Sequence, residues 1–114
     1  MSLQLNLKER VKLFNNEGIS FMNDRKHSKI DFIMNKEITI LDFDFINGSD
    51  GEYVVFIINE DNENFYFGGS VLTANLKELK DEGYLPIIQT DGLPVKLVEK
   101  QSKRGRKYVG VEYL

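Results

Sequence analysis

From Glu37 onward apolar and polar side chains alternate along the chain, and this period of two restricts the fold more than any other feature of the sequence. The run "EITILDFDFI" alternates large apolar residues with acidic ones, the turn signal "NGSDG" follows, and "EYVVFIIN" is a second, β-branched run. A polar stretch, "EDNEN", then leads to "FYFGG". The pattern predicts three antiparallel strands in a meander. In the third strand we expect Phe65 and Phe67 to face the core and Tyr66 to face outward.

A helix and a second hairpin are predicted after the meander. Leu72, Leu76 and Leu79 recur at helical spacing, with Ser70 in position to cap the N-terminus and Gly83 just past the end. After a connector that contains "DGLP", two more alternating runs, "VKLVEK" and "KYVGVEYL", are joined by "QSKRGR". From residue 37 to residue 114 the order is therefore three strands, one helix and two strands.

The first 36 residues have a different pattern. One helical face is apolar over residues 3–16, and it consists of Leu3, Leu7, Val11 and Phe14. Residues 28–35 suit either a short helix or a strand. We expect residues 1–36 to form a helical extension that packs on the remainder of a single domain, 1–114. Self-association through the apolar stripe, giving a homo-oligomer, is the alternative.

The composition suits one domain and argues against most catalytic chemistry. With 114 residues, of which 41% are apolar, the chain can bury one core. The chain has no cysteine and a single histidine, His27, which leaves no thiolate and little for a metal site or an imidazole base. We therefore expect no enzyme activity, no metal and no cofactor. The absence of a membrane-spanning apolar run and of a secretory signal predicts a cytoplasmic protein.

Charge is distributed unevenly along the chain. There are 15 Lys and Arg against 18 Asp and Glu, a net charge of −3. Residues 95–114 hold six bases and two acids, a net charge of +4, so that the other 94 residues carry −7. Clustered cations attract a polyanion even when the molecule as a whole is negative. The stretch "KQSKRGRKY" therefore indicates a nucleic acid as the first candidate partner.

The fold class that these elements predict is mainly β with helices, of the α+β type. The order of elements over residues 37–114 resembles that of the oligonucleotide/oligosaccharide-binding fold (OB-fold), a five-stranded barrel, here with a helix between strands three and four and an extra N-terminal helix. OB-folds bind ligands on the face of strands two and three and through the loops that join strands one and two and strands four and five. In this chain those loops are "NGSDG" and "QSKRGR".

The run "LDFDFINGSDGEYVVFIINEDNENFYFGGSVLTANLKEL", followed by the basic hairpin, resembles the small OB-fold single-stranded DNA-binding proteins encoded by phages of lactic-acid bacteria. The resemblance covers residues 37–114, about two-thirds of the chain. It implies a protein that coats single-stranded DNA during phage replication or recombination, with replication or recombination proteins as further partners.

Binding of single strands without sequence preference needs cations along the phosphates and flat rings on which bases stack. The cations of the second hairpin and the outward-facing tyrosines meet these needs. The predicted nucleic-acid-binding residues are Lys96, Lys100, Lys103, Arg104, Arg106, Lys107, Tyr108, Tyr66 and Tyr53. The alternatives are a charged surface that protects an edge hairpin and half-buried tyrosine rings. RNA is an alternative to DNA, because neither kind of contact reads the sugar. The alternative function is a protein-interaction module on an OB-like scaffold.

Overall fold

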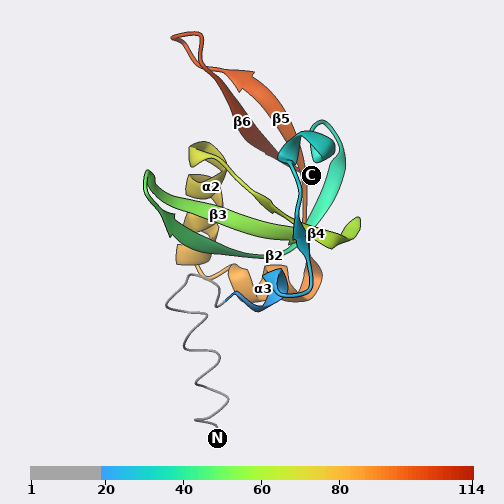
Figure 1. The fold of residues 1–114 in the computed structure, drawn as a ribbon. Coiled ribbons are helices and arrows are strands. Elements are labelled where there is room, and N and C mark those ends of the chain that lie inside the picture. Colours follow the sequence, from blue (N-terminus) through green and yellow to red (C-terminus); the bar gives the residue numbers. More distant parts are fainter. Residues whose placement is uncertain (1–18) are drawn as a thin grey trace, which may run out of the picture.

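The computed structural model describes residues 19–114, which form one six-stranded sheet with two α-helices (Figure 1). Along the sheet the strands lie in the order β1-β4-β3-β2-β5-β6. The strands are β1 (Lys26–His27), β2 (Glu37–Gly48), β3 (Gly51–Ile58), β4 (Asp61–Phe67), β5 (Leu93–Gln101) and β6 (Lys107–Tyr113), and the helices are α2 (Ser70–Asp81) and α3 (Leu85–Asp91).

The predicted meander, helix and second hairpin are all present, and the mainly β, α+β fold class is confirmed. The sheet is open, with β1 and β6 at its two edges. Closure into a five-stranded barrel is not seen in the described residues, where β4 pairs only with β3 and β1. The region also contains one strand, β1, and one helix, α3, that the sequence did not predict.

A β-bulge in β2 decides which of its side chains face the core. Ile38 and Ile40 are buried in the core before an irregularity in the register between Ile40 and Asp42, and Phe43 is buried after it. The extra residue moves the inward-facing positions from even to odd numbers and bends the strand. Residues 37–40 of β2 pair with β5, while Ile40 and the part beyond the bulge pair with β3.

Both faces of β3 are buried, so the sheet separates two apolar clusters. Val54, Phe56 and Ile58 point into the larger cluster, whereas Val55 and Ile57 point into the smaller one on the opposite face. The buried members of the larger cluster are Ile33, Ile38, Ile40, Phe43, Val54, Phe56, Ile58, Tyr66, Leu72, Leu76, Ile88, Val95 and Leu97. Those of the smaller cluster are Ile46, Val55, Ile57 and Phe65.

Helix α2 is joined closely to β3. The Thr73 hydroxyl oxygen accepts a hydrogen bond of 2.9 Å from the backbone N–H of Val54 in the buried interior, which satisfies a donor that would be costly to bury alone. A Cβ on Gly68 would lie 2.7 Å from Val54 Cγ1, so only glycine lets the chain turn from β4 into the helix at this distance. The helix begins at Ser70 and Gly69 occupies the N-cap position, so the prediction that Ser70 is the cap is wrong.

Helix α3 forms within the connector, for which the sequence predicted no element. Pro86 lies in its first turn, where a missing N–H is tolerated, and Ile88 is buried in the larger cluster. Gly92 ends the helix with φ of +81°, and a Cβ there would lie 2.5 Å from the Cγ2 methyl of Thr39. None of the helices in residues 19–114 is both long and apolar enough to cross a bilayer.

Residues 19–33 pack on both sides of the sheet. Strand β1 runs parallel to β4 at the sheet edge. Ile33, in a short 3-10 helix (Ile30–Ile33), joins the larger cluster, which corresponds to the short-helix alternative for residues 28–35. Phe21 and Met22, in a second 3-10 helix (Ser20–Met22), pack against the smaller cluster. The helix predicted over residues 3–16 lies outside the described part of the chain.

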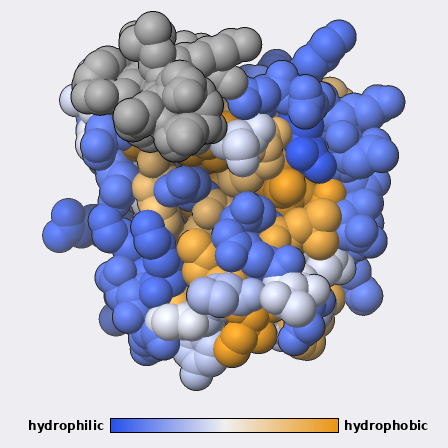
Figure 2. All heavy atoms as spheres, turned by 90° about the horizontal axis from the view of Figure 1, so that it is seen from below, coloured by the Kyte–Doolittle hydropathy of each residue, from blue (hydrophilic) through white to orange (hydrophobic). Residues whose placement is uncertain are grey.

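Apolar side chains are also visible at the surface. Seen from below, they gather in the middle of the molecule and are bordered by hydrophilic side chains (Figure 2). The large apolar residues that are exposed in the described region are Phe32, Tyr84, Ile87, Tyr113 and Leu114.

Candidate nucleic-acid interface

The β5–β6 hairpin projects beyond the rest of the molecule and carries the basic stretch at its tip (Figure 1). Its strands pair in continuous register from Val95 opposite Tyr113 to Gln101 opposite Lys107. The tip closes on Ser102. Its carbonyl oxygen accepts a 2.9 Å hydrogen bond from the Gly105 N–H, and its hydroxyl oxygen accepts one of 3.1 Å from the Arg106 N–H. Gly105 has φ of +84°, a conformation that glycine adopts without strain.

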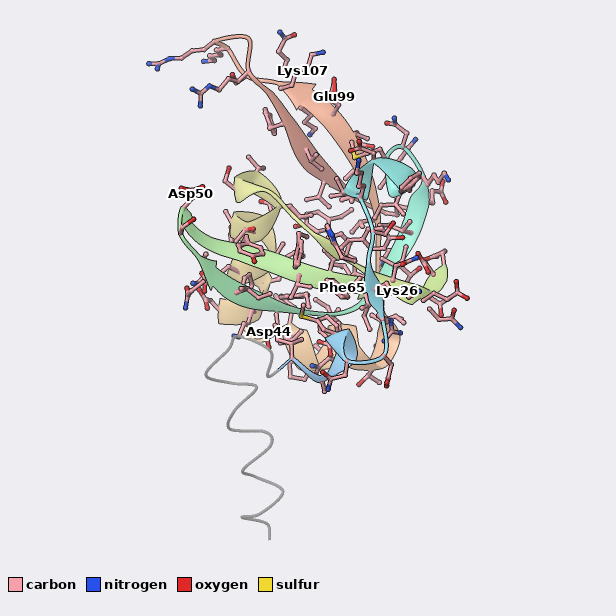
Figure 3. All side chains as sticks on the ribbon, viewed as in Figure 1. Lys26, Asp44, Asp50, Phe65, Glu99 and Lys107 are labelled. Atoms are coloured by element: carbon pink, nitrogen blue, oxygen red, sulfur yellow. The ribbon has the colours of Figure 1, made fainter. Side chains whose placement is uncertain are left out.

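The cations at this tip are exposed to solvent. Lys103, Arg104 and Arg106 are exposed and make no ion pair with any residue of the described region. Lys107 forms a 3.7 Å ion pair with Glu99, and both side chains are largely exposed, so that the pair adds little stability. Figure 3 shows Lys107 and Glu99 on the projecting part of the hairpin. Residues 100–108 contain five bases and no acid, which is a strong local attraction for phosphates.

Lys100 and Tyr108 lie directly opposite each other on one face of the hairpin. The Lys100 side chain runs along the hairpin over Gly110, because a Cβ on that glycine would lie 2.8 Å from Lys100 Cδ. Tyr108 is half-buried. A cation with a supported carbon chain therefore lies next to an aromatic ring, which is the combination that single-stranded nucleic acids require.

Lys96 is placed less favourably than the tip residues. It lies opposite Glu37 of β2 on one side and opposite Glu112 of β6 on the other. Directly opposed residues of antiparallel strands project from the same face, so Lys96 has two acidic neighbours on its face, although it forms no ion pair within the described residues. The local charge around Lys96 is negative, and a phosphate gains less there than at the hairpin tip.

The prediction that Tyr66 faces outward is wrong. Its side chain is 2% exposed and lies in the larger cluster, where its ring stacks on Phe56 with centroids 5.8 Å apart. Phe65 and Phe67 do share the opposite face, but that face belongs to the smaller cluster. The face assignment was wrong because β3 is apolar on both faces, so that either face of β4 could have been the core face. Tyr66 therefore offers no ring surface to a base.

The Tyr66 hydroxyl group donates a hydrogen bond to the Asp61 carboxylate, which also accepts one of 2.9 Å from the Asn64 side-chain amide. Burial, together with this carboxylate, raises the pKa of Tyr66 to about 12. The hydrogen bonds from Tyr66 and Asn64 lower the pKa of Asp61. Tyr66 is thus a core residue whose polar end is satisfied at the surface.

The smaller cluster ends in a row of rings that the sequence did not predict. His27 of β1 is exposed, and its ring centroid lies 4.5 Å from that of Phe67 with an interplanar angle of 34°. Phe67 in turn meets Tyr53 edge-on at 5.2 Å. Tyr53 and Phe67 are half-buried. The row joins β1, β4 and β3. In the sequence, its first member, His27, is marked only by its position in the basic run "RKHSK" before the first predicted strand.

The β2–β3 turn borders a cleft of a different character. The cleft is lined by residues 48–53 of the turn and by residues 68–70 before α2. Its walls include Asp50 and Glu52, and Lys77 of α2 forms an ion pair with Glu52. These carboxylates make the cleft unfavourable for phosphates. Residues 19–114 contain no group of three or more acidic or histidine side chains that could hold a metal ion.

The residues that were predicted to bind nucleic acid thus fall into four groups in the structure. Lys100, Tyr108 and the tip cations lie together on the hairpin, and Lys96 lies between Glu37 and Glu112 nearer its base. Tyr53 belongs to the aromatic row, and Tyr66 is in the core. Comparison of the chain with protein-family models, with curated proteins and with solved structures found no match.

Proposed function

We propose that the protein binds single-stranded DNA without sequence preference and coats it during phage replication or recombination in the host cytoplasm. The observation that carries the proposal is the projecting β5–β6 hairpin, whose tip holds Lys103, Arg104 and Arg106 exposed and without acidic partners in residues 19–114. Such a cation cluster on an otherwise acidic chain attracts a polyanion at one place on the surface.

The strand order supports an OB-type arrangement. Strands β2, β3 and β4 form the meander, the helices follow, and β5 pairs with the first meander strand and with β6. In an OB-fold the loop between the last two strands takes part in ligand binding, and the barrel itself is only partly closed. The hairpin tip is that loop in this chain. We propose that the sheet is an opened member of this architecture.

In the proposed mechanism the tip cations capture the phosphates first and displace their counterions. Bases then stack on Tyr108, beside which Lys100 meets the next phosphate. Neither contact reads base edges, so the binding tolerates all sequences. A homo-oligomer would hold several such sites on one strand and raise the affinity through effective concentration.

A salt titration of oligonucleotide binding tests the proposal. A fluorescently labelled single strand is titrated with the 114-residue protein at several salt concentrations, in parallel with a duplex of the same length. We expect tighter binding to the single strand and a linear fall of log affinity with log salt. Replacing Arg104 or Arg106 by alanine should lower the affinity about equally for all sequences, and should flatten the slope by about 0.7 for each phosphate that the variant no longer neutralises.

Lys36→Ala is the matched control, because Lys36 is an exposed cation outside the hairpin. Its affinity and salt slope should equal those of the wild type. No binding of the wild-type protein at low salt overturns the proposed function. An unchanged slope in both arginine variants removes the hairpin from the mechanism.

A protein-interaction module is the second candidate function, and the exposed Tyr84 and Ile87 side chains of the α3 region favour it. Apolar side chains at the surface mark protein contacts when they are contiguous. Binding of a purified replication protein with fixed stoichiometry would support this function, provided that the wild-type protein does not bind DNA. The Ile87→Ser variant should then bind that replication protein more weakly.

A further inference from the structure

We propose that His27 on the edge strand β1 is a stacking contact for an unpaired base, so that the segment before the five-stranded part of the sheet extends the DNA-binding surface. The inference rests on the proposed function and goes beyond it, because the site lies apart from the basic hairpin. The observation that carries it is the row of rings formed by His27, Phe67 and Tyr53 across β1, β4 and β3.

The backbone holds the imidazole in place. His27 lies opposite Phe65 in the parallel pairing of β1 with β4, and the following N–H, that of Ser28, donates a 3.0 Å hydrogen bond to the Phe65 carbonyl oxygen. One face of the His27 ring lies against Phe67, at 4.5 Å between centroids and 34° between planes. His27 is nevertheless exposed among residues 19–114, so a base can approach the ring on the side away from Phe67. A ring that is already stacked on one side loses little freedom when a second ring covers it.

The surroundings favour a nucleic acid over an uncharged aromatic ligand. Residues 25–29, "RKHSK", contain three cations and no acid. Lys26 and Lys29 are exposed and form no ion pair within the described region, and Figure 3 shows Lys26 beside Phe65 on this part of the sheet. His27 therefore supplies a ring for the base, and the cations that neighbour it in the chain supply positive charge for the flanking phosphates.

Substitutions at His27 test the inference through affinity and salt dependence together. His27→Ala should weaken binding of an oligo-dT strand about fivefold or more, the lower bound for one base stack. Loss of the contact with Phe67 should lower the melting temperature by only a few degrees, which leaves the protein folded at the temperature of the binding assay. His27→Phe replaces the imidazole by a ring that carries no charge. If the contact is stacking on a base, this variant should retain the wild-type affinity and the wild-type salt slope. Phe32→Ala removes an exposed aromatic ring outside the row, 66% accessible, and should have no effect.

The chain contains no tryptophan, so a His27→Trp variant has a single indole as a local reporter. Stacking of a base on this indole should quench its fluorescence when oligo-dT is added. A Phe32→Trp variant is the matched control, and its fluorescence should not change.

The outcomes separate the two proposals. If the wild-type protein binds no single strand, the proposed function fails, and this inference fails with it. If the wild-type protein binds and Arg104→Ala weakens it, but His27→Ala binds normally and His27→Trp is not quenched, the function stands and the role of His27 is overturned.

Discussion

The hydroxyl group of Tyr66 marks the boundary between the core and solvent. Its ring is buried against Phe56, and its oxygen donates a hydrogen bond to the Asp61 carboxylate near the start of β4. The residue thus contributes through packing and through one charge-assisted hydrogen bond, which is stronger than a bond between neutral groups. Protonation controls this bond, so the stability of the fold should depend on pH at both ends of the scale.

At high pH the pKa of Tyr66, raised to about 12 from 10.0, determines the effect. The folded protein holds the phenol proton more tightly than the unfolded chain does, so the stabilisation is complete below pH 10 and disappears as the pH rises toward 12. We expect the free energy of unfolding in urea to fall more steeply over this range for the wild type than for Tyr66→Phe. Equal slopes for the two proteins would contradict the assignment.

At low pH the stability instead falls as the pH decreases. The pKa of Asp61 is lowered from 3.8, chiefly by the hydrogen bond from Tyr66. Its contribution is therefore present above pH 3.8 and is lost as the pH falls through the lowered value. Asp61→Asn is the control variant, and its stability should decline less on acidification than that of the wild type.

Single residues also show why the sequence predicts some contacts and not others. The hairpin residues Lys100 and Tyr108 were predicted to lie on one hairpin, and the structure places them opposite each other because the pairing is local. His27 has no local signal of that kind. Its proposed role depends on a parallel pairing with β4, 38 positions away along the chain, and alternation within one strand does not reveal such a partner.

At the scale of elements, the β5–β6 hairpin consists of a base that packs in the core and a tip that projects from it. Its core-facing residues, such as Val95 and Leu97, lie near its base, whereas the hydrogen bonds of residues 102–106 join them to one another and to Gln101. Fold stability and the proposed DNA binding would therefore depend on different parts of the same hairpin.

Replacing residues 102–106 by Asn-Gly tests this separation. Gln101 and Lys107 are directly paired, and a two-residue Asn-Gly loop closes such a pair in a hairpin turn. We expect the free energy of unfolding to change by less than about 1 kcal/mol. Affinity for a single strand at about 0.1 M salt should fall more than tenfold, because three cations are removed.

The matched control keeps the loop and changes Lys103, Arg104 and Arg106 to glutamine. Charge loss alone should weaken binding to the same extent. If the shortened hairpin binds as well as the wild type, the tip has no part in binding. If only the shortened hairpin loses affinity, the loop backbone rather than its charge makes the contact.

The elements that the sequence predicts well are those with strong local signals. Helix α2 combines a leucine period with a terminal glycine, and β2, β3 and β4 are separated by dense polar turns. Helix α3 was missed because its seven residues include Pro86 and carry one buried side chain, Ile88. Strand β1 was missed because two residues have no period at all.

At the scale of the whole molecule, opposite charges are separated along the chain. Residues 95–114 carry +4 and the remainder −7, and the tip of the basic part projects away from the acidic body (Figure 1). A strand of DNA would be attracted to the tip and repelled by the acidic parts of the body, which would restrict the orientations in which an encounter succeeds.

The association rate constant should therefore depend strongly on ionic strength. Stopped-flow mixing with a labelled single strand should show the rate constant falling about tenfold or more between roughly 0.02 and 0.2 M salt, as expected when steering contributes to encounter. The Lys103, Arg104 and Arg106 to glutamine variant should show a weak salt dependence. A rate constant that is independent of salt in the wild type would contradict electrostatic capture.

Closure of the sheet is the feature of the whole molecule that sequence reasoning could not decide. The order of elements predicts which strands are neighbours, and the pairings of β2 with β3 and with β5 follow it. Whether the outer strands then meet depends on accumulated twist and on the bulge in β2. These are small rotations summed over many residues, and no single residue in the sequence reports them.

The hydrogen bonds that close the hairpin on Ser102 have a consequence for the thermodynamics of the proposed DNA binding. With the Gly105 and Arg106 N–H groups already bonded, the backbone of the tip has little conformational entropy left to lose when phosphates arrive. The entropic cost of binding falls on the long side chains of Lys103, Arg104 and Arg106, which can move from one phosphate to the next while the backbone stays fixed. A tip of this kind would release and recapture neighbouring phosphates without refolding, so that a protein that binds a long strand as proposed would be able to slide along it.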